Sequence, residues 1–206
     1  MLEQLHIAKL DMPSARVLAD RASIFQDLKF CIQCCDRLNC IFAPGVAEDA
    51  ILQQALWTAA LISYARCFAT GVRQGLNPSI YDKFEGEPRD AHQMYIDMRN
   101  RHIAHSVNPF EQVTIGAVLA PPTSASREVQ GVTTLSMKRI SDGIEGVQQL
   151  RFMALTALKE MERLCKEQTD LVLEDARKIP IDELYARSSP RVVAPEPKAA
   201  GRRRDS

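Results

Sequence analysis

The sequence lacks the long apolar runs of a membrane protein. No stretch approaches the roughly 18 uninterrupted apolar residues that a membrane-spanning helix needs. The first residues, MLEQLHIAKLDMPSARV, do not show a basic start followed by an apolar run, so they do not resemble a secretory signal. We therefore expect a cytoplasmic protein that does not use a membrane as a partner.

The sequence also lacks a net charge that would indicate a partner. Its 26 lysine and arginine residues offset 26 aspartate and glutamate residues, which excludes the overall basicity of many nucleic-acid-binding domains. The charge is unevenly distributed, because residues 187–206 hold six basic and two acidic side chains, a surplus of +4. With its prolines and its GRRR run, this segment is predicted to be a disordered basic tail.

A complete set of cysteine ligands is missing as well. Four of the six cysteines lie in the stretch FCIQCCDRLNC, as Cys31, Cys34, Cys35 and Cys40. The Cys31-x-x-Cys34 pair has no second CxxC or HxxxH pair to complete a zinc site, and it lies within a helical pattern. We therefore expect these thiols to be small buried apolar groups, and we expect no metal and no cofactor.

Helical periodicity is what the sequence does contain. Apolar residues recur every three or four positions in four segments, 13–42, 47–70, 88–106 and 144–179. Two β-prone segments, VTIGAVLA and GVTTLSMK, flank the turn-forming APPTSASREVQ and predict a hairpin at about 112–138. The predicted fold is mostly α, a bundle of four long helices with a β-hairpin inserted between the third and the last long helix. This helical domain would span residues 1–186, before the tail of residues 187–206.

The third predicted helix ends in the stretch MRNRHIAHS, which carries the main candidate site. It holds two arginines and two of the four histidines of the chain. Arg99 and His105 are six positions apart and diverge by about 120° on a straight α-helix. They meet only if the helix loosens near its end, or if a symmetric dimer brings a second copy against it. A purely structural alternative is that cations at the end of a helix complement its dipole.

These residue types suit the cleavage of RNA without a metal. An imidazole with a pKa of about 6.5 can take a proton from a ribose 2′-hydroxyl or give one to the leaving 5′-oxygen. The guanidinium of Arg99 can hold the phosphate, and Asn100 can orient it. His102 and Arg101 are candidates for contacts with the substrate, and so are Tyr64 and Arg66 on the second helix. For these four residues a surface, dimer-contact or core role stays open.

The stretch RNRHIAHS resembles the R-[polar]-x(4–6)-H signature of the HEPN superfamily, with Arg99, Asn100 and His105 at the signature positions. LWTAALISYARCF resembles the helix that precedes this signature in abortive-infection HEPN proteins. The resemblance covers most of residues 15–176. It implies a metal-independent endoribonuclease that acts on RNA as a homodimer, as a toxin or an anti-phage effector with a possible cognate antitoxin protein.

Two alternatives stay open. Many HEPN proteins are non-catalytic, so the chain is alternatively a silent HEPN-like helical dimer that binds RNA, a nucleotide or a protein. A metal site formed by His92, His102 and His105 is a further alternative, although no carboxylate or cysteine completes a recognisable spacing around them.

Overall fold

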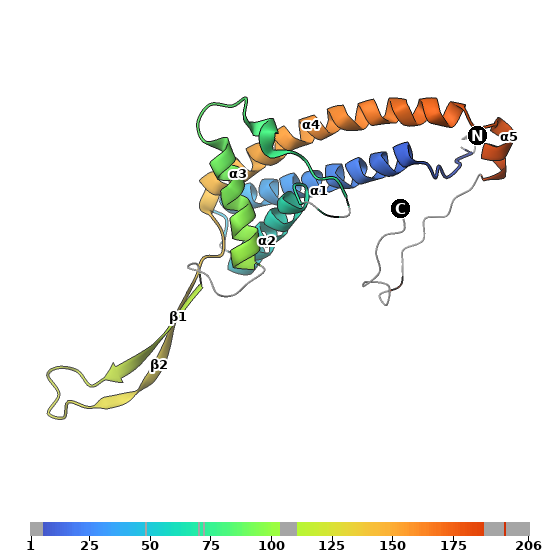
Figure 1. Ribbon diagram of the computed structural model, residues 1–206. Coiled ribbons are helices and arrows are strands. Elements are labelled where there is room, and N and C mark those ends of the chain that lie inside the picture. The colour runs from blue at the N-terminus through green and yellow to red at the C-terminus, as the bar shows by residue number, and fades with distance from the viewer. Residues whose placement is uncertain are drawn as a thin grey trace. The chain divides into compact units, whose positions relative to one another are not determined.

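Helices dominate the structure, a computed structural model that describes residues 6–47, 49–69, 71, 73–103, 111–187 and 196. Of the described residues, 62% are helical, and the strands among them form one small antiparallel sheet of two strands, which confirms the predicted fold class. In chain order the elements are α1 (Pro13–Ile41), α2 (Ala50–Arg66), the 3-10 turn η1 (Pro78–Tyr81), α3 (Pro88–Asp97), the π-helix η2 (Met98–Ile103), β1 (Glu111–Leu119), β2 (Val129–Lys138), α4 (Gly143–Arg177) and α5 (Ile181–Ala186) (Figure 1).

Local signals in the sequence explain most helix ends. Proline occupies the first position of α1 and of α3, where its missing N–H leaves no hydrogen bond unmade. At the start of α2, the Asp49 carboxylate accepts a hydrogen bond from the Leu52 N–H at 2.9 Å and caps the helix. Gly45, between α1 and α2, has a φ of +82°, which glycine adopts without strain.

Helix α2 is shorter than the predicted segment 47–70, and it ends at Arg66 before Gly71 is reached. The chain folds back after this point and supplies partners for the last carbonyl groups. The Leu76 N–H donates to the Cys67 carbonyl at 2.8 Å, and the Arg73 side chain donates to the Arg66 carbonyl at 3.0 Å. These bonds replace the intrahelical ones, so the helix can stop before the glycine.

The structure divides into two compact units, one of Met1–Phe25 with Lys159–Ser206 and one of Gln26–Leu158. In the first unit, the Arg21 guanidinium donates to the Leu164 carbonyl at 2.7 Å. The Gln168 amide donates to the Ser14 carbonyl at 2.9 Å. Among the described residues of this unit, Ile24, Met161 and Val172 are buried and apolar. Of the predicted tail, Arg187 and Glu196 are described, and the other residues lie outside the described ones.

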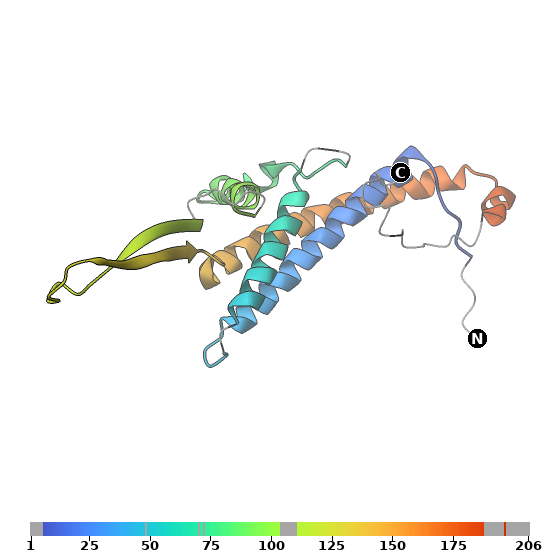
Figure 2. The same cartoon turned by 90° about the horizontal axis from the view of Figure 1, so that it is seen from below.

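The second unit contains the bundle core. Helix α2 runs back alongside the second half of α1, as Figures 1 and 2 show. The buried side chains of α1 follow a helical spacing, which places them on one face. The core of this unit includes Leu28, Cys31, Cys35, Leu38, Trp57, Leu61, Tyr64, Tyr81, Tyr95, Val147, Leu150 and Met153. Trp57, the single tryptophan of the chain, is 3% exposed within this core.

Most of the clustered thiols are buried, as predicted. Cys31, Cys34 and Cys35 are at most 2% exposed, whereas Cys40 is exposed on another face near the end of α1. Burial raises the pKa of Cys34 to about 11 and that of Cys67 to about 12, which keeps both thiols protonated and unreactive at neutral pH. All six cysteines are free.

The predicted hairpin is present, with β1 and β2 paired from Glu111–Lys138 to Leu119–Val129. Val118 pairs with Gly131 and Leu119 pairs with Val129, so Gln130 is an extra residue at a bulge. Almost every strand side chain is exposed, so no described helix covers either face of the hairpin.

Within the described part of the chain, none of the helices has the length and the apolar character that crossing a bilayer requires.

Candidate functional site

The candidate motif begins where the third helix changes its winding. Helix α3 ends at Asp97, and Met98–Ile103 continue as a π-helix that contacts α2 and α3. Tyr95 and Met98 are buried and fix this segment to the core of the bundle unit. π-Helical turns are rare and occur frequently at functional sites. The change of winding therefore marks the segment that the sequence singled out.

Arg99 and Asn100 contact each other in this segment. The Arg99 guanidinium donates to the Asn100 side-chain oxygen at 2.8 Å. Arg99 is half-buried, and Asn100 and Arg101 are exposed. Among the described residues, neither Arg99 nor Arg101 forms an ion pair with a carboxylate, in contrast to Arg89, whose Nε lies 3.1 Å from Asp82 on the same unit. The positive charge of Arg99 is thus uncompensated there and available to an anion.

His105 lies outside the described residues, as does the side chain of His102. The winding that is described still bears on how Arg99 could meet a residue six positions later. A π-helix turns the chain by less per residue than an α-helix, so residues six apart separate further around its axis. A wider turn of this kind does not by itself bring positions six residues apart onto one face of a helix.

Tyr64, a candidate for substrate contact, lies inside the core. Its side chain is 0% exposed, and its hydroxyl lies 3.0 Å from the Tyr81 hydroxyl and 2.9 Å from His92 Nδ1. The Tyr81 hydroxyl donates to the Met153 carbonyl at 3.1 Å. Tyr81 therefore accepts the proton of Tyr64, and the Tyr64 oxygen accepts from His92 Nδ1–H. We call Tyr64, Tyr81, His92 and the Met153 carbonyl the core network.

Burial sets the protonation states in the core network. It raises the pKa of both tyrosines well above the usual value, and it lowers the pKa of His92 to about 4, with Arg89 adding to the decrease. His92 is 5% exposed and neutral at neutral pH. His92 is therefore neither solvated nor a helix cap. The Tyr64 hydroxyl cannot reach a phosphate at the surface while the core stays closed.

The core network was not foreseen from the sequence, although one signal was present. The apolar residues that recur at helical spacing in the third helix are Ala91, Met94, Tyr95 and Met98. The buried positions are His92, Tyr95 and Met98, three residues apart, and Met94 is exposed. A histidine in register with two apolar residues indicated a buried imidazole.

Arg66 lies at the exposed end of α2, and its guanidinium is 3.6 Å from the Asp27 carboxylate. The same carboxylate is 2.6 Å from Arg73. Arg66 therefore shares one acidic partner with Arg73 and keeps part of its charge for another ligand.

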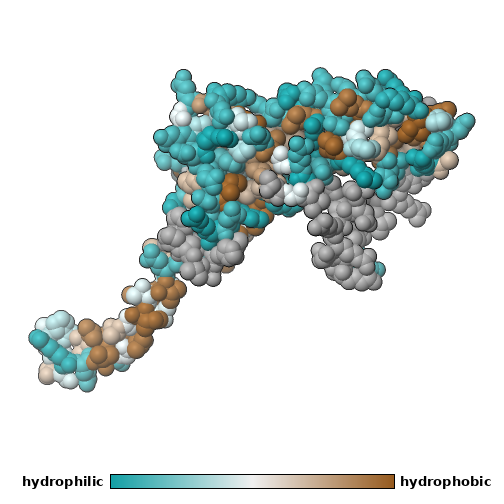
Figure 3. Space-filling model, in the orientation of Figure 1, coloured by the Kyte–Doolittle hydropathy of each residue, from teal (hydrophilic) through white to brown (hydrophobic). Residues whose placement is uncertain are grey.

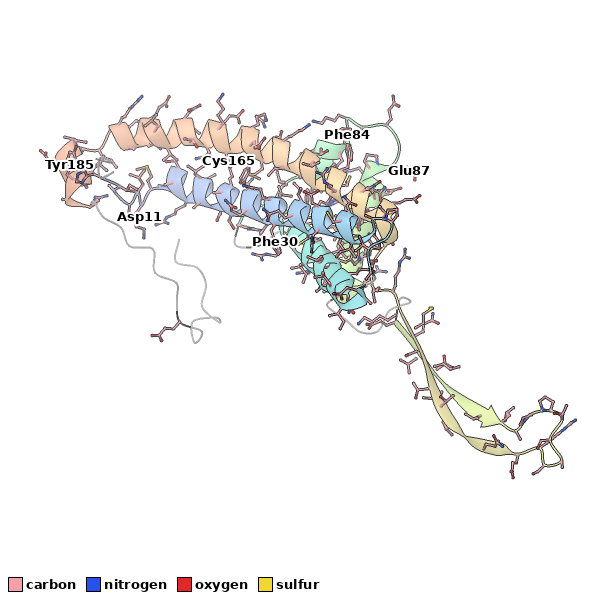
Figure 4. All side chains as sticks on the ribbon, turned by 180° about the vertical axis from the view of Figure 1, so that it is seen from behind. Asp11, Phe30, Phe84, Glu87, Cys165 and Tyr185 are labelled. Carbon is pink, nitrogen blue, oxygen red and sulfur yellow. The ribbon has the colours of Figure 1, made fainter. Side chains whose placement is uncertain are left out.

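An open groove of about 630 Å³ lies beside α3 in the same unit. Its lining includes apolar side chains of Phe84, Met94 and Phe152 and three carboxylates, those of Glu85, Glu87 and Asp90. Figure 4 shows Phe84 and Glu87 on this side of the bundle. Carboxylates repel phosphates, so this groove does not suit RNA. The described side chains form no group of three or more histidines, cysteines or carboxylates that could hold a metal ion.

No family model matches the sequence, and no curated protein or solved structure matches the chain. The resemblance to the HEPN superfamily therefore depends on the motif residues and the helical layout. Function must be argued from the geometry of Arg99, Asn100 and the segment that carries them.

Proposed function

We propose that this protein is a metal-independent endoribonuclease of the HEPN type that acts as a homodimer in the cytoplasm. The observation that carries the proposal is the Arg99–Asn100 pair, a guanidinium held by an amide at a π-helical turn without an acidic partner among the described residues. Such a guanidinium can bind a phosphate through its remaining donors. The free thiols agree with a reducing compartment.

In the proposed reaction, a neutral His105 takes the proton of a ribose 2′-hydroxyl, whose oxygen attacks the adjacent phosphorus. The bond from phosphorus to the 5′-oxygen breaks, and a protonated His105 of the second copy gives a proton to the leaving oxygen. The products are a 2′,3′-cyclic phosphate and a 5′-hydroxyl. One imidazole cannot be protonated and neutral at the same time, which is why the mechanism uses two copies.

The other candidates contribute through binding in this proposal. Arg99 stabilises the negative charge that grows on the phosphate, and Asn100 fixes the orientation of Arg99. Arg101, His102 and Arg66 would contact neighbouring phosphates, and the basic tail would add affinity that falls with salt. Tyr64 supports the bundle that carries them. A toxin or anti-phage role, with a cognate antitoxin protein as partner, belongs to the proposal through the resemblance.

The first test is a cleavage assay on mixed cellular RNA in the presence of EDTA. We expect wild type to cut, and we expect His105→Ala and Arg99→Ala to lose activity by about 10²-fold or more. Arg89→Ala is the matched arginine control on α3, and His6→Ala is the matched histidine control. Both controls should cut as wild type does, and the products should carry 2′,3′-cyclic phosphate ends.

Two outcomes would contradict the proposal. If His105→Ala cuts as fast as wild type, the histidine is not the acid or base. If all proteins are folded and none cuts, while wild type binds RNA and Arg99→Ala does not, the chain is the silent binding module instead. Binding is measured on the same RNA by a filter-retention assay at two salt concentrations.

A further inference from the structure

One face of the hairpin carries more large aliphatic side chains than the other. Because strand side chains alternate, the register puts one set of residues on this face, which we call the aliphatic face: Val113, Ile115, Ala117, Leu119, Val129 and Val132, together with Thr134, Ser136 and, at the base of the hairpin, Glu111 and Lys138. Its five larger aliphatic members are 63% to 72% exposed. Figure 3 shows hydrophobic side chains along the hairpin. Exposed apolar surface of this extent marks an interaction site.

The opposite face has a different composition, which provides an internal comparison. We call it the mixed face, and its members are Gln112, Thr114, Gly116, Val118, Gly131, Thr133, Leu135 and Met137. Only three of them, Val118, Leu135 and Met137, are large apolar residues, against five on the aliphatic face. A partner that recognises apolar surface would therefore prefer the aliphatic face.

Charge restricts the partner. Strand residues 112–119 and 129–137 contain no charged side chain. Nucleic acids and anionic membranes are bound through lysine and arginine, so neither suits this surface. Each end of the hairpin carries one positive and one negative side chain, Lys138 with Glu111 at the base and Arg127 with Glu128 near the tip. Two such hairpins can meet without opposing like charges.

The surface area is also sufficient for self-association. The five large aliphatic side chains expose about 500 Å² per copy, so two copies would bury about 1,000 Å², near the lower limit of specific interfaces. An isolated two-stranded hairpin is marginally stable in water, and packing against another sheet stabilises it. Packing of its aliphatic face against another sheet would therefore stabilise the hairpin itself.

We propose that the aliphatic face of the hairpin packs against the same face of a second copy of this chain. A two-fold axis makes such a contact self-complementary, since each copy presents the same patch. The inference shares with the proposed nuclease only the need for a second copy. Its test measures assembly without RNA, so its failure can be told apart from a failure of the proposed reaction.

The test is sedimentation equilibrium of the full chain over a range of concentrations. Wild type should reach twice the mass of one chain. The triple variant Val113→Thr/Ile115→Thr/Val132→Thr should raise the dimer dissociation constant at least tenfold, because threonine keeps the β-branched shape and removes apolar surface. The matched control, Val118→Thr/Leu135→Thr/Met137→Thr on the mixed face, should associate as wild type does. A monomeric wild type, or an equal loss in both variants, would overturn the inference.

A pair of variants with opposite charges at residue 115 distinguishes a lost contact from a folding defect. Ile115→Glu and Ile115→Lys, studied separately, should each be monomeric, because like charges would meet near the two-fold axis. Mixed in equal amounts, they should form a heterodimer. If the mixture stays monomeric while each variant keeps the circular dichroism spectrum of wild type, the aliphatic face is not the contact.

Discussion

The helical bundle and the hairpin belong to the same unit, yet they differ in which side chains they bury. The bundle buries three tyrosines and a histidine and gives each a hydrogen-bond partner. The hairpin exposes valine, isoleucine and leucine on uncharged strands. The bundle thus buries polar groups, and the hairpin exposes apolar ones.

The difference shows where each region obtains its stability. In the bundle, burying a hydroxyl or an imidazole costs several kcal/mol unless a partner is present, and the core network supplies that partner. Tyr95 extends this pattern, because its hydroxyl donates to the Gly146 carbonyl at 3.0 Å at the start of α4. The apolar side chains of the hairpin are not buried by any described part of its own chain. We therefore infer that the hairpin is stabilised by contact with another chain.

The largest expected effect in this comparison is that of Tyr64→Ala. The change removes a fully buried ring and leaves Tyr81 and His92 without their shared partner, so it should lower the free energy of unfolding by about 3 to 5 kcal/mol. Urea unfolding followed by circular dichroism measures this loss. Tyr185→Ala, at a tyrosine that is exposed, should change the value by less than about 1 kcal/mol. Similar losses in both variants would mean that Tyr64 is not a core residue.

The second effect concerns pH. His92 has a folded-state pKa of about 4, below its unfolded value of about 6.5, so the proton binds better to the unfolded chain. Its contribution is fully present above pH 6.5 and is lost as the pH falls toward 4, by up to about 3 kcal/mol. We expect His92→Asn to flatten this part of the stability profile. A profile between pH 6.5 and 5 that is as steep in the variant as in wild type would exclude His92 as the cause.

The smallest expected effect is in the hairpin. Ile115→Thr replaces a residue that is 65% exposed with another β-branched one, so the free energy of unfolding of the dilute monomer should change by less than about 0.5 kcal/mol. The measurement is urea unfolding at a concentration where sedimentation shows one chain. A loss comparable to that of Tyr64→Ala would show that the hairpin is part of the folded core, and the contrast between the two regions would disappear.

The sequence predicted on which helix the candidate site lies. The apolar spacing predicted the third helix, which begins at Pro88, and the motif was expected at its end. Apolar spacing does not specify the π-helical winding over Met98–Ile103, which follows the buried Tyr95 and begins at the buried Met98. The hydrogen bonds of Tyr64 in the core network could not be predicted either, because Tyr81 and His92 are 17 and 28 positions away in the chain.

The sequence by itself determined the elements whose causes are local. Proline, Asp49 and Gly45 mark helix ends within a few residues, and alternation along two β-prone segments specifies the hairpin. Only the tertiary structure decided which polar side chains became internal, because burial and hydrogen bonding join groups far apart in the chain, as between Tyr81 and Met153. It also divided the chain into two units, since α1 and α4 each supply residues to both. Periodicity identifies the apolar side of a helix, but the packing partners decide what that side contacts.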